Sequence, residues 1–222
     1  MIQKINSLPF PTTGEIHSVD VGSHTYNLNS NKSDYDIIHI DLGIQLDKNR
    51  DMMRYFRTEN TENWYYSYTD FIHHLENGPP LLYEAMGLLS TKVKYPLNNL
   101  FSPDIYPSSY INCCVKMLQA GQASKTNKDI AAFKMYFVCK SLIKNNNIDF
   151  SIIHQKVMSM FDAVKMKKAT RDQIFEKMII GLNELQDNTI HFDIFKTTML
   201  SKYRKFLIDN KENIDALLYE IE

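Results

Sequence analysis

Two aspartates separated by one residue, Asp34 and Asp36, follow a Gly22-Ser23 pair after a short polar spacer. Residues at positions i and i+2 of a strand point to the same face, about 7 Å apart. A Gly-Ser pair that begins a short helix presents backbone N–H groups and a hydroxyl to a phosphate. Carboxylates on one side of a pocket and a phosphate cradle on the other are the components needed to hold a metal–triphosphate complex.

This pattern resembles the nucleotidyltransferase superfamily related to DNA polymerase β, whose signature is Gly-Ser, a short spacer and Asp-x-Asp. More narrowly, residues 22–36 are similar to predicted nucleotidyltransferases of bacteria and phages that read GSxxYGxxxxxSDYD. The segment Asn77–Glu84, which reads NGPPLLYE, is similar to the Gly-Asn-Pro-x-x-Leu-Glu-type segment of such proteins. The resemblance extends over residues 1–90, and the remainder matches loosely.

The resemblance implies a role for each matching residue. Asp34 and Asp36 would ligate Mg²⁺, while Gly22 and Ser23 would contact the phosphates of a nucleoside triphosphate. Lys134, in the later helical part, would reach toward the same phosphates. From the residues alone other interpretations stay open: a polar turn that leads into a strand, a Gly-Ser helix cap, and a lysine on a solvated helix face.

The chain departs from the family pattern at specific positions. Asn27 stands where the family usually has glycine, and asparagine is the non-glycine residue best suited to a left-handed backbone. His24 stands where a basic residue is common. The family carries a third carboxylate on a later strand, but the best candidate strand, 64–68, has no acid. Glu62 and Asp70 lie at its two ends, so either is a candidate third ligand.

Hydrophobic periodicity predicts an α+β fold, in which a small mixed sheet is followed by helices. We expect a nucleotidyltransferase-like lobe over residues 1–90 and a helical lobe over residues 91–222. In the first lobe we expect a short helix over 24–28, a helix or loop over 47–61, a helix over 70–76 capped by Thr69, and strands over 15–21, 35–44 and 63–68. Helical patterns then cover 81–90, 107–120, 129–144, 148–164, 169–185 and 192–222, the last as one helix or two.

Composition narrows the function classes. The 222 residues carry 25 basic and 26 acidic side chains, a formal net charge of −1, so no overall positive field attracts nucleic acid. Three cysteines form neither a disulfide framework nor a zinc pattern, which favours a reducing compartment. No apolar segment is long enough for a signal core or a membrane span. We therefore expect a cytoplasmic protein without membrane contact, and the Asn-, Lys- and Ile-rich composition suits a phage or bacterium of low GC content.

The expected function is Mg²⁺-dependent transfer of a nucleoside monophosphate from a nucleoside triphosphate to an acceptor. RNA, a protein and a small molecule are all candidate acceptors. The alternative is a catalytically degenerate relative that acts as a nucleotide-binding or protein-interaction module, for example a phage factor acting on a host component. An RNA-binding helical module has little support from the near-neutral charge.

Overall fold

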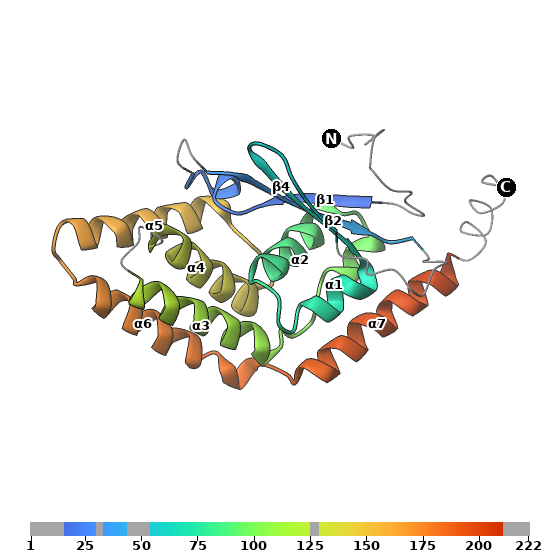
Figure 1. Ribbon diagram of the computed structural model, residues 1–222. Helices are drawn as coiled ribbons and strands as arrows, with labels where there is room; N and C mark the ends of the chain where they lie inside the picture. The colour runs from blue at the N-terminus through green and yellow to red at the C-terminus, as the bar shows by residue number, and fades with distance from the viewer. Residues whose placement is uncertain (1–15, 30–32, 44–53, 125–128, 211–222) are drawn as a thin grey trace.

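The computed structural model describes residues 16–29, 33–43, 54–124 and 129–210, and places a small mixed sheet over a larger set of helices (Figure 1). The sheet has the order β1-β2-β4-β3. Strands β1 and β2 pair antiparallel, as do β3 and β4, whereas β2 and β4 pair parallel. The expected α+β class is confirmed. The strands are β1 (Ile16–Val21), β2 (Tyr35–Asp41), β3 (Arg54–Arg57) and β4 (Thr61–Ser67).

The helices largely follow the expected ranges. They are α1 (Tyr68–His74), α2 (Leu81–Lys92), α3 (Ser108–Ala123), α4 (Asp129–Asn145), α5 (Phe150–Lys165), α6 (Arg171–Asn183) and α7 (Phe192–Asp209), with short 3-10 helices η1 (His24–Tyr26), η2 (Leu97–Leu100) and η3 (Gln186–Asn188). Within the described ranges, no helix combines the length and the apolar character needed to cross a membrane. The parts of the expected elements at residues 15, 44, 47–53 and 211–222 lie outside the described residues.

Several details within residues 1–90 differ from expectation. Residues 54–57, expected as part of a helix or loop, form strand β3 because they pair with β4. Helix α1 is capped by Ser67 rather than Thr69: the Ser67 hydroxyl oxygen accepts a hydrogen bond from the Asp70 backbone N–H at 3.1 Å. A serine at the N-cap satisfies a backbone donor that the first turn of a helix leaves unpaired.

One face of the sheet is buried against helices, since α1 and α2 lie beneath it (Figure 1). The alternating residues Val19, Val21, Ile38 and Ile40 are each at most 1% exposed. Strand alternation directs their neighbours to the opposite face. That opposite face carries a stack of His39 on Tyr65, with ring centroids 4.1 Å apart.

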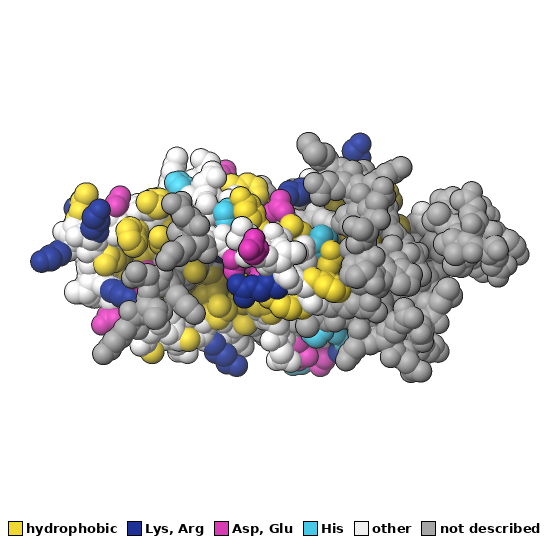
Figure 2. Space-filling model, turned by 45° about the horizontal axis from the view of Figure 1, so that its top comes forward, with side chains coloured by type: hydrophobic (Ala, Val, Ile, Leu, Met, Phe, Trp, Pro, Cys, Tyr) yellow, Lys and Arg dark blue, Asp and Glu magenta, His cyan; other side chains and the backbone are white. Residues whose placement is uncertain are grey.

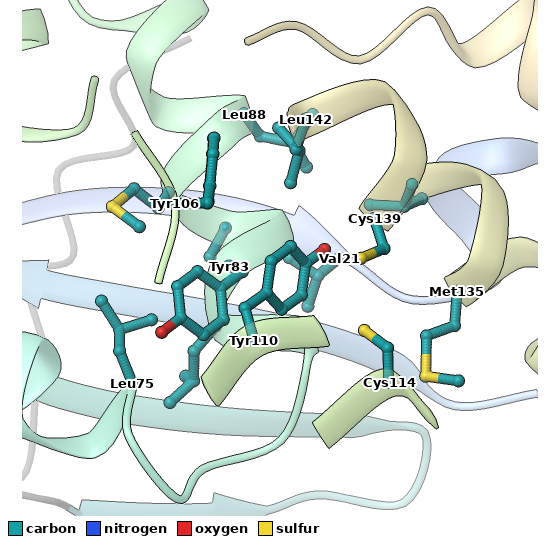
Figure 3. Packing of buried hydrophobic residues seen from close by; sticks show 14 of the residues in the cluster. Val21, Leu75, Tyr83, Leu88, Tyr106, Tyr110, Cys114, Met135, Cys139 and Leu142 are labelled. Atoms are coloured by element: carbon teal, nitrogen blue, oxygen red, sulfur yellow. The ribbon is translucent and has the colours of Figure 1, made fainter. Parts of the chain in front are cut away.

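The core continues from the sheet into the helices. The rings of Tyr83 in α2 and Tyr110 in α3 stack with centroids 4.1 Å apart, and Figure 3 shows both beside Val21 of the sheet. At the other end of the fold, helix α7 returns to the sheet. There the Tyr203 hydroxyl donates to the Leu42 carbonyl oxygen at 3.2 Å. Helices distant in sequence therefore support both ends of β2.

Arg171, the first residue of α6, closes the C-terminal end of α3. Its guanidinium donates to the carbonyl oxygens of Gln122, at 2.7 Å, and Ser124, at 3.1 Å. Its Nε also donates to Asp129, the first residue of α4, at 2.9 Å. Carbonyls in the last turn of a helix lack partners within that helix, so one side chain here satisfies the end of α3 and joins three helices.

We predict that Arg171→Ala lowers the free energy of unfolding by about 1–3 kcal/mol, because the α3 carbonyls and Asp129 lose their donor. Urea denaturation followed by circular dichroism measures the change. Arg204→Ala, at an exposed arginine of α7, is the matched control and should cost less than about 0.5 kcal/mol. Equal losses in the two variants would contradict the structural role of Arg171.

His39 gives a pH-dependent prediction. Its Nδ1 accepts from the Ser18 hydroxyl at 2.7 Å and its Nε2–H donates to the Asn63 side-chain oxygen at 3.1 Å. Burial lowers the pKa of His39 below its ordinary value, despite the opposing effects of Asn63 and Asp20. Below about pH 6.5 the unfolded chain therefore binds a proton that the folded chain does not, and stability falls as pH decreases.

Between pH 7 and pH 5, the midpoint temperature of thermal unfolding should fall less in His39→Gln than in the wild type. The difference between the two falls should be roughly 2–4 °C. Differential scanning fluorimetry across this pH range measures it. The remaining histidines are shared, so the difference between the two proteins isolates His39. Parallel pH curves would show that His39 does not resist protonation in the folded protein.

Candidate functional site

A row of paired residues crosses one end of the sheet. Val21 of β1 is paired with Asp36 of β2, Asp36 with Glu62 of β4, and Glu62 with Arg57 of β3. Residues paired across neighbouring strands point to the same face, with strands about 4.8 Å apart. The sheet register therefore places two carboxylates and a guanidinium side by side, although their residues are far apart in sequence.

This register corrects the expectation that the aromatic strand lacks an acid. Strand β4 begins at Thr61, before the expected boundary, and so contains Glu62 next to Asp36. Asp70 lies beyond the opposite end of β4, in the first turn of α1, where its carboxylate accepts from the Ser67 hydroxyl at 2.6 Å. Of the two candidate third carboxylates, Glu62 is the one adjacent to the aspartate pair. We refer to Asp34, Asp36 and Glu62 as the carboxylate cluster.

The Gly22-Ser23 corner lies directly against this cluster. Gly22 has a φ of +82°, and a Cβ at this position would overlap the Asp36 carboxylate. Glycine is thus required both for the backbone conformation and for the close approach. Ser23 precedes η1, and its side chain makes no capping hydrogen bond to it. Asn27, at the end of η1, has a φ of +53°, the left-handed conformation expected where the family has glycine.

His24 contacts the residues on either side of Asp34. Its Nε2–H donates to the Ser33 carbonyl oxygen at 2.8 Å, and its ring stacks on Tyr35 with centroids 3.8 Å apart. Asp34 lies between these two contact residues. The 3-10 helix after Gly22 therefore holds the residues that flank Asp34.

A buried ion pair joins the corner to the helices. Glu84 of α2 accepts from Lys134 Nζ of α4 at 2.9 Å and from the Gly22 backbone N–H at 3.1 Å. The Glu84 and Lys134 side chains are only 4% and 10% exposed. Lys134 therefore does not lie on a solvated face, because a carboxylate 50 residues earlier in the chain pairs with it. Glu84, within the segment that resembles the family, is a residue whose part in the site the sequence left unassigned.

Tyr26 completes the enclosure of this ion pair. Lys134 Nζ lies 5.2 Å from the centroid of its ring, in cation–π geometry. Burial and the nearby Glu84 carboxylate raise the pKa of Tyr26 well above its ordinary value. The Tyr26 carbonyl oxygen also accepts from the His154 Nδ1–H of α5 at 2.9 Å. Helices α2, α4 and α5 thus all contact the loop that carries Gly22 and Ser23.

Negative charge is concentrated around Asp36. Burial, followed by the charge of Glu62, raises the pKa of Asp36 from 3.8 to about 6. Lys134 opposes this rise, whereas the carboxylates of Glu84 and Asp34 add to it. Apart from burial, each cause is the charge of a group near Asp36, and the carboxylates outweigh the lysine. The surroundings therefore favour an additional positive charge at this position.

Part of that positive charge comes from Arg57. Its Nη2 lies 3.0 Å from Asp34 Oδ2, and its Nη1 lies 3.3 Å from Glu62 Oε1. The Arg57 side chain is 58% exposed, so these ion pairs face solvent. Figure 2 shows acidic and basic side chains adjacent near the middle of this face, next to hydrophobic side chains. Arg57 was not identified from sequence, since its segment was expected to be a helix or loop.

The donor set suits Mg²⁺ in chemical type. The carboxylate oxygens of Asp34, Asp36 and Glu62 are the hard ligands that Mg²⁺ prefers, and Glu62, Glu84 and Asp34 all place negative charge near Asp36. In the present side-chain positions, no three His, Cys, Asp or Glu residues in the described part of the chain are arranged to hold a metal ion. Asp34 and Glu62 are instead turned toward Arg57.

A cavity of about 430 Å³ lies between α2, α3 and α4, beside the buried ion pair. Glu84 and Lys134 form its polar end, and its other walls include Leu81, Met117, Ala120, Ala131, Met135 and Val138. This volume lies within the range of small-molecule sites, which are also mainly apolar with a few polar groups. Lys134 therefore borders both the carboxylate cluster and a space large enough for part of a small molecule.

We predict that Lys134→Met destabilises the protein by about 3–5 kcal/mol, because the Glu84 carboxylate is left buried without its cation. Chemical denaturation measures the loss. The double variant Lys134→Met/Glu84→Gln should recover most of it, since the glutamine oxygen still accepts from the Gly22 N–H. A double variant as unstable as the single one would contradict the buried-charge explanation.

Searched against protein-family models, curated proteins and solved structures, the chain matches none.

Proposed function

We propose that this protein is a nucleotidyltransferase, which transfers a nucleoside monophosphate from a nucleoside triphosphate to a hydroxyl acceptor. The acceptor hydroxyl would lose its proton to water, and its oxygen would form a bond to the α-phosphorus as the bond to the bridging oxygen breaks, so that pyrophosphate leaves. The observation that carries this proposal is the row across the sheet, which places Glu62 beside Asp36, with the Gly22 corner packed against the Asp36 carboxylate.

Each group in the site has a definite task in this proposal. Asp34, Asp36 and Glu62 would hold Mg²⁺, which supplies charge neutralisation for the triphosphate and lowers the pKa of the acceptor hydroxyl. Gly22 and Ser23 would lie along the phosphates. Lys134 would place a cation behind them, held in position by Glu84. An RNA end, a protein hydroxyl and a small molecule are the acceptor classes to test.

We predict Mg²⁺-dependent transfer of label from an α-³²P-labelled nucleoside triphosphate to RNA, protein or a small acceptor. The double variant Asp34→Ala/Asp36→Ala should abolish it. Glu62→Gln should reduce the rate about 100-fold or more, because one oxygen ligand of the cation is lost. Gel electrophoresis and thin-layer chromatography separate the three classes of labelled product.

Asp20→Asn is the matched control for loss of a carboxylate. Asp20 is an exposed residue of β1 that is paired with Ile37, so it belongs to the opposite face of the sheet from Asp36. Its substitution should leave transfer unchanged. Full activity in Glu62→Gln would remove Glu62 from the site, and label transfer that persists in the Asp34/Asp36 variant would refute the proposal.

The second candidate is a binding module that retains the fold without transfer. Two observations favour it: Arg57 neutralises Asp34 and Glu62, and the Gly22 N–H is already bonded to Glu84 rather than open to phosphate. This candidate predicts nucleotide or partner binding that survives Asp34→Ala/Asp36→Ala, without labelled product in the wild type.

A further inference from the structure

Arg57 occupies an unusual position for an exposed arginine. It is the last residue of β3 and is paired with Glu62 of β4. Its guanidinium contacts one carboxylate on each of two segments, Asp34 before β2 and Glu62 in β4. Both carboxylates belong to the cluster proposed to hold Mg²⁺. Arg57 is therefore the counter-ion of the site in the structure described here.

A divalent cation and Arg57 compete for the same oxygens. A ligand oxygen must lie about 2.0–2.1 Å from Mg²⁺, and a guanidinium held at the same carboxylates would face the cation at close range. An arginine does not relieve this repulsion by losing its proton, since its pKa exceeds 12. Arg57 must therefore move when a cation binds.

The surroundings of Arg57 permit this movement. Its side chain is 58% exposed, and those of Asp34 and Glu62 are 35% and 20% exposed, so both ion pairs reach solvent and are weak. Lys134 differs in this respect, because its side chain is 10% exposed and fixed by Glu84. Among the described residues around the carboxylate cluster, Arg57 is thus a cation that can move and Lys134 is one that cannot.

The phosphates of a bound nucleotide provide the new partner. The Gly22 corner borders Asp36, which lies two strand spacings, about 10 Å, from Arg57 along the row. A long arginine side chain that leaves Asp34 and Glu62 faces the phosphates placed there. Guanidinium groups bind phosphate oxygens through paired hydrogen bonds. Two carboxylates that already ligate a cation are weaker hydrogen-bond acceptors for the guanidinium than these phosphates.

We infer that Arg57 is a positioning residue that exchanges between the carboxylates of Asp34 and Glu62 and the phosphates of a metal-bound nucleotide. This inference rests on the proposed function. It means that Arg57 opposes cation binding when nucleotide is absent and supports nucleotide binding when the cation is present. The two effects have opposite signs, which a purely structural role would not produce.

The test uses Arg57→Gln, with Arg204→Gln on α7 as a matched control at another exposed arginine. Mn²⁺, as a probe of the carboxylate site, is titrated without nucleotide and followed by electron paramagnetic resonance. Binding of a non-hydrolysable ATP analogue is then measured by calorimetry at saturating Mg²⁺. Arg57→Gln should bind Mn²⁺ about three- to tenfold more tightly and the analogue about three- to tenfold more weakly. Arg204→Gln should change neither affinity.

The outcomes separate this inference from the proposed function, because neither measurement requires transfer activity. A wild-type protein that binds Mn²⁺ and the analogue, with Arg57→Gln unchanged or weaker for both, overturns the role of Arg57 alone. A wild-type protein that binds neither ligand overturns both proposals. Arg57→Lys checks the geometry: a lysine keeps the charge, so the Mn²⁺ affinity should stay near wild type while analogue binding falls.

Discussion

The site depends on one buried ion pair. Glu84 and Lys134 come from helices α2 and α4, and together they hold the Gly22 backbone at the end of β1. Removing either charge alone would leave the other in a poorly solvated place, so both must be retained or both replaced. This constraint links the helices to the corner where the phosphates are proposed to lie. The carboxylate cluster is positioned from the other side, by the pairing of β2 with β4.

The charges around the cluster form a graded arrangement. Lys134 is buried and fixed, Asp36 is half-buried with a raised pKa, and Arg57 reaches the cluster from solvent. Among the described residues, four carboxylates (Asp34, Asp36, Glu62 and Glu84) lie near two cations, Arg57 and Lys134. We propose that a further cation balances this excess of negative charge. The proposed transfer reaction and the proposed movement of Arg57 use these same features.

The local features of the site could be predicted from sequence, and the long-range ones could not. Gly22 and the left-handed Asn27 are recognisable because spacing within one turn determines their geometry, and Asp34 and Asp36 because they flank Tyr35, the first residue of β2. The position of Glu62 was misjudged because the aromatic residues after it marked the strand more strongly than its polar start. Extending β4 to Thr61 depends on pairing with β2, which a local pattern does not contain.

Lys134 and Arg57 also have long-range partners that the local sequence does not reveal. A lysine in a helix is expected to be solvated unless its partner is known, and Glu84 is 50 residues away. The segment that contains Arg57 is polar and charged and lacks the apolar pattern of a strand. Its pairing with β4 as an edge strand therefore becomes evident only from the structure. The α+β class was predictable because the change from period two to helical period is a property of long segments.

The turn between β3 and β4 has a consequence for how the chain tolerates changes in length. Thr58 donates its backbone N–H to the Thr61 carbonyl oxygen at 2.9 Å, which closes this connection tightly. Side chains alternate along a strand, so deleting one residue from 58–60 would shift the pairing and turn Arg57 to the opposite face. Glu62 and Asp36 would remain together, because β2 and not β3 sets their alignment. Deletions at this bend would therefore detach the guanidinium from the acids while leaving the acids themselves in place.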